Sequence, residues 1–193
     1  MSAGLAPITA EDLMAMPDDG VDRWIIRGEL REAEMSFRGV LHTSTTSNVD
    51  FSLRLWLRTQ PRPRGIVLVG DAGVRLRQEP DNESTVGIDL LYLSPELAAQ
   101  MPSTPKIIEI VPTLAIEILS PSDRQEDVEE KIDLFLEVGV LQVWSINPKR
   151  RTVTVYRPDR KPMLFNDSQE LNGEPELPGF MVPVLSFFED IDP

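Results

Sequence analysis

Two segments in the middle of the chain are apolar almost throughout: Val86-Gly-Ile-Asp-Leu-Leu-Tyr-Leu93 and Thr113-Leu-Ala-Ile-Glu-Ile-Leu119. Runs of this length and composition are typical of strands that are buried on both faces, at the centre of a sheet that helices cover. Each run carries a single acid, Asp89 in the first and Glu117 in the second. We therefore predict two central strands of one sheet, each with a carboxylate in apolar surroundings.

The flanking segments supply helices and further strands. Apolar residues recur at helical spacing in residues 41–58, and a second helix is expected over residues 123–138, ending at Gly139. The expected buried face of the first helix comprises His42, Thr46, Val49, Leu53 and Trp56. The other expected elements are a short helix opened by a capping box at Thr9 to Asp12, short strands at 23–26, 29–31, 66–69 and 73–77, a hairpin of 140–146 and 152–156, and an apolar tail at 177–188. This order predicts an α/β fold with a mixed sheet of at least five strands, in a single domain over residues 1–193.

Residues 61–64, 79–85 and 157–162 are rich in proline or polar residues and are predicted to be surface loops. None of them is long enough to divide the chain into two domains.

The chain is acidic. It has 19 basic and 32 acidic residues among 193, and a net charge of −13. This balance argues against general electrostatic binding of nucleic acid, which normally depends on a basic face. A local basic strip or a bound metal could still supply positive charge, and Arg54, Arg58, Arg62 and Arg64 offer one such strip.

Composition excludes several kinds of site. With no cysteine and one histidine, a thiolate zinc site, a cysteine nucleophile and a multi-histidine metal site are all impossible. The glycine-rich phosphate loops and the serine-hydrolase and zinc-protease motifs are missing as well. Carboxylate and lysine chemistry remains. Because no signal peptide and no apolar run of membrane-spanning length are recognisable, we expect a cytoplasmic protein without a membrane partner.

Asp89 and Glu117 are the most informative residues. Burying an ionised carboxylate costs several kcal/mol unless the group is paired, neutral or metal-bound. Two such acids on neighbouring strands would repel each other unless a cation lay between them, and Mg²⁺ prefers oxygen ligands of this kind. The alternative is that each acid lies at a strand end, solvated or paired with an arginine. The sequence leaves both interpretations open.

Lys131 favours the first interpretation. On a helical wheel it falls between Phe135 and Val138, on the arc that faces the sheet, and Asp127 lies four residues before it and could orient it. The helix's five other acids, Glu126, Glu129, Glu130, Asp133 and Glu137, project away from that arc, as a solvated face should. The alternative for Lys131 is a side chain whose ammonium extends along the helix to water.

The order of short motifs resembles the Uma-type family, whose members are classed as "putative restriction endonucleases", a large bacterial group in the PD-(D/E)XK nuclease superfamily. The similar segments are the opening helix, Arg27-Gly-Glu-Leu30, His42, Asp89-Leu-Leu-Tyr-Leu-Ser-Pro95, Ile116-Glu-Ile-Leu-Ser-Pro-Ser122, Asp127-x-x-x-Lys131, Gly139-Val140, Val143-Trp144 and Leu177-Pro-Gly-Phe180. The chain departs from the family pattern at Arg27 and Asn147 (aspartate is usual), Ile88 (proline), Val143 (an aromatic) and Leu119, which occupies the lysine position of the E-x-K element.

The resemblance implies a restriction-endonuclease-like core and a Mg²⁺- or Mn²⁺-dependent endonuclease acting on nucleic acid, most simply DNA. It implies catalytic roles for Asp89, Glu117 and Lys131, with the metal held by Asp89, Glu117 and the carbonyl of Ile118, and with the lysine function moved to the helix. Accessory roles are expected for Glu29, which could hold a second metal or water, for His42, which could contact phosphate or structure the pocket, and for Asp127.

A second hypothesis is a catalytically inactive protein of the same fold that acts as a protein-interaction module, which the acidic charge favours. A homodimer is compatible with either hypothesis. A third hypothesis, a small-molecule hydrolase, lacks any nucleophile motif.

Overall fold

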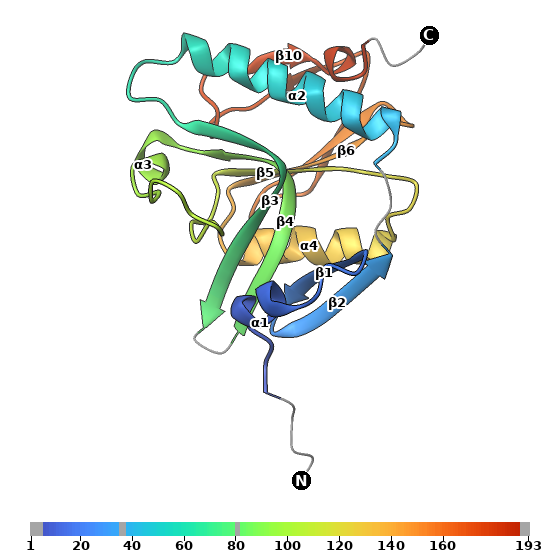
Figure 1. Cartoon of the computed structure of the whole chain (residues 1–193). Helices are drawn as coiled ribbons and strands as arrows, with labels where there is room; N and C mark the ends of the chain where they lie inside the picture. The colour runs from blue at the N-terminus through green and yellow to red at the C-terminus, as the bar shows by residue number, and fades with distance from the viewer. Residues whose placement is uncertain (1–5, 35–37, 80–81, 190–193) are drawn as a thin grey trace.

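A computed structural model describes residues 6–34, 38–79 and 82–189 of the chain, and Figure 1 shows its arrangement. Within these residues one sheet of eight strands runs in the order β2-β1-β4-β5-β6-β7-β8, and β3 also pairs with β4. The strands are β1 (Val21–Ile26), β2 (Glu29–Glu34), β3 (Ile66–Glu79), β4 (Asn82–Leu93), β5 (Leu114–Ile118), β6 (Gln142–Asn147), β7 (Thr152–Tyr156) and β8 (Met163–Asn166). A small second sheet pairs β9 (Glu170–Asn172) with β10 (Met181–Pro183).

Five helical segments accompany these strands in the described residues. They are α1 (Ala10–Ala15), α2 (Val40–Thr59), α3 (Pro95–Ala98), α4 (Gln125–Glu137) and the 3₁₀ turn η1 (Val184–Phe187). The capping box predicted at the start of α1 is present, because the side chains of Thr9 and Asp12 each accept from the other's backbone N–H. The mixed α/β fold predicted from the sequence is confirmed.

The two long helices cover opposite faces of the sheet, α2 above it and α4 below it in Figure 1. One core cluster joins Leu53 and Trp56 of α2 to Leu90 and Ile116, and the other joins Phe135 of α4 to the face opposite. The apolar runs predicted as central strands are therefore buried on both faces, as expected.

One connection differs from the rest of the sheet. β5 and β6 are parallel, with Glu117 opposite Ser145, whereas the other pairs of named strands in the described residues are antiparallel. A parallel pair requires a crossover, which α4 provides. The chain leaves β5 just after Glu117 and Ile118, so α4 begins beside the end of that strand.

The predicted boundaries between residues 66 and 85 are wrong. The short strands expected at 66–69 and 73–77 are one long strand, β3, with a bulge between Val69 and Ala72. A bulge interrupts the alternation of apolar residues without ending the strand. Most of the expected surface loop at 79–85 is also strand, because β4 begins at Asn82, while Pro80 and Asp81 lie outside the described residues.

The sequence suggested that the acidic face of α4 is solvated, but two of its acids form ion pairs. Glu130 forms an ion pair with Arg31 of β2 at 2.9 Å, and Glu137 pairs with Arg27 at 2.6 Å. Arg27 has φ +51° in the tight turn between β1 and β2, followed by Gly28 at φ +76°. The short strands predicted at 23–26 and 29–31 thus form a hairpin, and these ion pairs link it to α4.

The apolar tail docks on the core as predicted, with Leu177, Phe180, Val184 and Phe187 fully buried or nearly so. Four of the five residues predicted for the buried face of α2 are buried, and the exception is Thr46, which is half-buried while its neighbour Thr45 is buried. No helix in the described residues is long and apolar enough to cross a membrane. The amino-terminal residues on which the signal-peptide prediction depends, 1–5, lie outside the described part.

Candidate functional site

A cleft of about 340 Å³ lies where β4 and β5 meet the β1–β2 hairpin and the start of α4. Its lining includes Asp89, Glu117, Ile118, Asp127 and Lys131. Five of the seven predicted site residues are therefore brought to one cleft, although they come from three different elements. In all, the described lining holds seven acids and three basic residues, and the basic ones are Arg38, Arg124 and Lys131.

Asp89 is positioned by strand pairing. In the antiparallel register of β4 and β5, Leu90 lies opposite Ile116, which brings Asp89 beside the Glu117 end of β5. The Oδ2 atom of Asp89 accepts a hydrogen bond from the backbone N–H of Ile118 at 2.8 Å. The side chain of Asp89 thus ties the two central strands together at the cleft.

His42, from the first turn of α2, contacts the same oxygen. Its Nε2 lies 3.3 Å from Oδ2 of Asp89, and both residues are 7% exposed. Burial alone would raise the pKa of Asp89, but His42 and the Ile118 N–H stabilise the carboxylate and leave the pKa below its usual range. Asp89 is therefore an ionised carboxylate at neutral pH.

Lys131 faces the sheet, as the helical wheel predicts. Its Nζ donates to the carbonyl oxygen of Gly87 at 3.2 Å and to Oε2 of Glu117 at 3.4 Å. Burial by itself would lower the pKa of Lys131, but the nearby Glu117, Asp71 and Asp89 raise it overall. The ammonium stays charged among these carboxylates, and no hydrogen bond joins it to Asp127 in the described residues, so the predicted orienting role of Asp127 lacks a contact.

Glu117 is a largely buried acid whose negative charge is only partly balanced by its neighbours. One oxygen, Oε2, meets Lys131, while the other, Oε1, is buried and has no hydrogen-bond partner in the described residues. Burial raises the pKa of Glu117 to about 8, because Asp89 and Asp71 add repulsion that Lys131 only partly offsets. An unpartnered buried carboxylate oxygen is costly, and a cation would relieve it.

Asp71 is a cleft residue that the sequence interpretation missed. It lies in the bulge of β3 with φ +56°, directly after Gly70 at φ +103°. A Cβ atom on Gly87 would overlap its carboxylate, so the side chain of Asp71 lies against the backbone of β4. Partial burial raises its pKa, with repulsion from Asp89 adding to the effect and Lys131 opposing it. The interruption Gly70-Asp71-Ala72-Gly73 between the two apolar runs was the signal available in the sequence.

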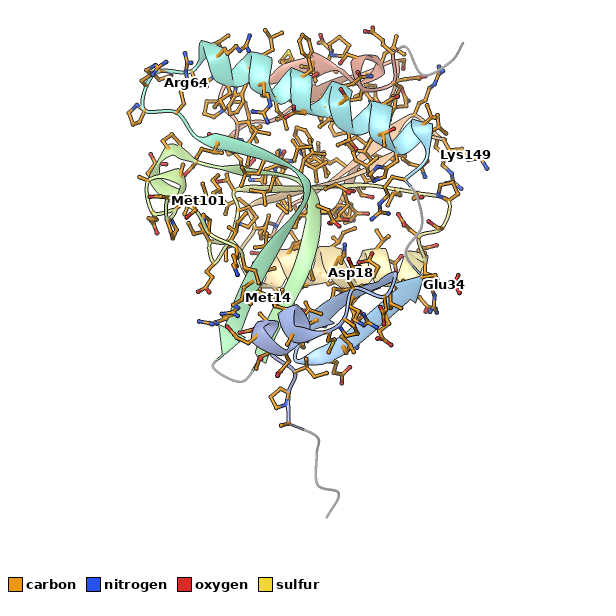
Figure 2. The ribbon with its side chains drawn as sticks, in the orientation of Figure 1. Met14, Asp18, Glu34, Arg64, Met101 and Lys149 are labelled. Carbon is orange, nitrogen blue, oxygen red and sulfur yellow. The ribbon has the colours of Figure 1, made fainter. Side chains whose placement is uncertain are left out.

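The remaining predicted site residues lie elsewhere. Glu29 is exposed, pairs with Arg31 at 3.0 Å and is not part of the cleft lining. Arg54 pairs with Asp50, and Arg64 donates to the carbonyl oxygens of Arg58 and Gln60 at the end of α2. Figure 2 shows Arg64 at the far end of α2 from Glu34, a residue of the cleft wall. None of Arg54, Arg58, Arg62 and Arg64 is in the cleft lining, and their role as a basic strip for nucleic acid stays a prediction.

The donor set fits a hard divalent cation. Asp89 and Glu117 are neighbouring carboxylates with excess negative charge, and each has one oxygen not held by another protein group. No group of three or more acidic or histidine side chains converges on one point within the described residues. Mg²⁺ is often bound by only one or two carboxylates, with water and substrate oxygens completing its shell, so two carboxylates and a carbonyl are sufficient.

Comparison with known proteins identifies the family of the chain. The model of the Uma2 family, described as "Putative restriction endonuclease", matches residues 10–185. The chain belongs to the Uma2 family. The match spans every cleft residue named above, and it confirms the resemblance drawn from the motifs.

A solved structure shares the Uma2 chain's fold. The crystal structure of a "putative nuclease" belonging to DUF820 from Anabaena variabilis ATCC 29413 is 22% identical, with a TM-score of 0.76, and the alignment covers 94% of this chain and 98% of that one. At this identity the similarity shows the fold. Among curated proteins, none matches the chain.

Proposed function

We propose that this Uma2 protein is a divalent-metal-dependent nuclease that hydrolyses phosphodiester bonds, with DNA as its substrate. The observation that carries the proposal is the convergence of Asp89, Glu117 and Lys131 in one cleft, with Oε1 of Glu117 buried and unpartnered. A structural ion pair would need only one acid for the lysine. The surplus carboxylate is explained by a cation that the site recruits.

Each residue has a defined part in this proposal. Asp89, Glu117 and the carbonyl of Ile118 would hold Mg²⁺ or Mn²⁺. When bound, such an ion polarises a phosphate oxygen and lowers the pKa of water. Lys131 keeps its charge next to Glu117 and would stabilise the negative charge that develops on the phosphate during attack.

The charge of the cleft makes binding of nucleic acid dependent on the metal. Seven acids against three basic residues in the described lining repel a phosphate backbone when no cation is present. Metal would therefore be required for the substrate to enter as well as for the reaction. Arg38 and Arg124 are the other positive charges of the lining, and in this proposal they would contact phosphates that flank the cleaved one.

The experiment is a cleavage assay with Mn²⁺ on single-stranded and duplex DNA, using the wild-type protein, Asp89→Ala and Lys131→Ala purified in parallel. Activity in the wild type alone supports the proposal, and equal activity in all three preparations indicates a contaminating nuclease. RNA of the same sequence tests the choice of DNA.

The second candidate is a non-catalytic interaction module of the same fold. The acidic lining and the net charge of −13 favour it, because a basic protein partner would be attracted where nucleic acid is repelled. Absence of metal binding in the wild type would support this candidate. Light scattering after gel filtration tests whether the chain is a homodimer under either proposal.

A further inference from the structure

The two carboxylate oxygens of Asp89 have different surroundings. Oδ2 accepts from the Ile118 N–H at 2.8 Å and lies 3.3 Å from Nε2 of His42. Oδ1 takes part in no hydrogen bond among the described residues, while Asp89 itself lines the cleft. One oxygen is held inside the protein and the other is left for a ligand.

Asp89 is the one ion-pair partner of the imidazole ring of His42 among the described residues. It lies on the buried face of α2 with Val49 and Leu53, at 7% exposure, and neither ring nitrogen has a hydrogen-bond partner in the described residues, although Nε2 lies 3.3 Å from Oδ2 of Asp89. It is also absent from the cleft lining, so it is not placed to touch a substrate. A buried imidazole whose nitrogens make no hydrogen bond costs stability, and packing alone would be served better by an apolar side chain.

We propose that His42 is a positioning residue, which with the Ile118 amide fixes Oδ2 of Asp89 so that Asp89 presents only Oδ1 to the metal. This inference rests on the metal site of the proposed function. A carboxylate with one oxygen held cannot rotate about its terminal torsion, so it binds an ion through a single oxygen in a fixed direction. Mg²⁺ demands near-ideal octahedral geometry, whereas larger cations accept a carboxylate that binds through both oxygens.

Partners that orient a ligand without touching the metal usually change metal affinity by about 10–100-fold. We therefore expect His42→Leu to weaken Mg²⁺ binding by about 10–100-fold. Ca²⁺ binding should fall much less, because Ca²⁺ accepts flexible and bidentate carboxylates. The ratio of the two affinities is a property that a merely structural role of His42 would not change.

Three further variants make the test specific. His42→Gln keeps a nitrogen donor at about the distance of Nε2 and should retain affinity near that of the wild type, whereas His42→Asn is too short and should behave like His42→Leu. Thr45→Val is the matched control, because Thr45 lies one turn further along the same buried face and its Oγ1 has no partner in the described residues. It alters buried polarity beside His42 and should leave metal affinity unchanged.

Isothermal titration with Mg²⁺ and Ca²⁺ gives the affinities, and circular dichroism confirms that each variant is folded. Because His42 is the single histidine of the chain, its ring resonances can be followed without assignment experiments. They should shift when Mg²⁺ is added to the wild type and stay unchanged in Asp89→Ala. In a double-mutant cycle, His42→Leu should have no further effect on affinity once Asp89 is alanine.

The outcomes separate the two proposals. If the wild type binds Mg²⁺ and folded His42→Leu binds it equally well, the positioning role is overturned while the metal site stands. If Thr45→Val loses as much affinity as His42→Leu, the effect is one of packing and the inference is also overturned. If the wild type binds no metal at all, the metal site and the positioning role fall together.

Discussion

The Nζ of Lys131 lies 3.4 Å from Oε2 of Glu117, so a helix and the central strand beside it share one ion pair at the cleft. The two residues are connected by a short segment that leaves β5 after Ile118 and enters α4 at Gln125. Leu119 occupies the position where the E-x-K element has its lysine, and the charge comes instead from the second turn of α4. The parallel pairing of β5 and β6, which brings α4 back across the sheet, is what makes this substitution geometrically possible.

Divalent metal should stabilise the folded protein. A ligand that binds only the native state adds about 2.7 kcal/mol at a hundredfold excess over Kd, which corresponds to about 5–10 °C in Tm for a chain of this size. We expect Mg²⁺ or Mn²⁺ to raise the Tm of the wild type but not that of Asp89→Ala. Glu29→Gln is the control, since this exposed acid lies outside the cleft lining and should leave the shift intact. Equal shifts in wild type and Asp89→Ala would place the ion on the acidic surface.

Removing the charge of Glu117 should stabilise the metal-free protein at alkaline pH. The pKa of Glu117 is raised from 4.5 to about 8, so the native state holds its proton more tightly than the unfolded chain does. Its contribution to stability is fully present below pH 4.5 and is lost as the pH rises to about 8. Glu117→Gln should therefore show a smaller fall in Tm between pH 5 and pH 8.5 than the wild type. A parallel fall in both proteins, measured in the presence of EDTA, would contradict this assignment.

Lys131→Ala should abolish nuclease activity while the fold is retained. Loss of a preorganised charge donor typically costs about 10²–10³ in rate. The helix should tolerate the change, because alanine is the better helix former. The measurement is the rate of DNA cleavage with Mn²⁺, alongside circular dichroism. Lys161→Ala, an exposed lysine in the turn between β7 and β8, is the control and should keep full activity. Undiminished cleavage by Lys131→Ala would remove the lysine from the mechanism.

Gly87→Ala should destabilise the protein through Asp71. The added methyl group would overlap the carboxylate of Asp71, and overpacking of this kind costs about 1–3 kcal/mol. Asp71→Gly removes that carboxylate and suits the positive φ at this position. The double variant should therefore recover most of the loss seen in Gly87→Ala, as measured by denaturant unfolding. Equal losses in the single and double variants would show that Asp71 does not lie against Gly87.

Much of the arrangement around the central strands was predictable. The apolar runs that contain Asp89 and Glu117 identified β4 and β5, because only a strand covered on both faces is apolar at successive positions. Lys131 could be placed on the sheet-facing side of α4 from helical periodicity alone. These two regularities are enough to predict that Asp89, Glu117 and Lys131 lie near one another.

What could not be predicted depends on irregular backbone and on partners distant in sequence. Asp71 reaches the cleft because β3 has a bulge, and a bulge breaks the two-residue period from which strands are recognised. Arg27 and Glu137 are 110 residues apart, so their ion pair could not be inferred from local spacing. The same holds for His42 and Asp89, whose contact depends on how α2 packs across β4.

The docking of Phe180, Val184 and Phe187 beneath α2 has a consequence for how the chain is made. The apolar face of α2, with Leu53 and Trp56, is covered in part by residues that the ribosome adds well over a hundred positions later. Until those residues are synthesised, the apolar face of α2 lacks part of the layer that covers it in the folded protein. Phe135 of α4, by contrast, packs in a cluster with β4 and with Val143 of β6, which follow or precede it much more closely in the chain. The buried residues that pack with α4 are therefore all synthesised before the last residues that cover α2.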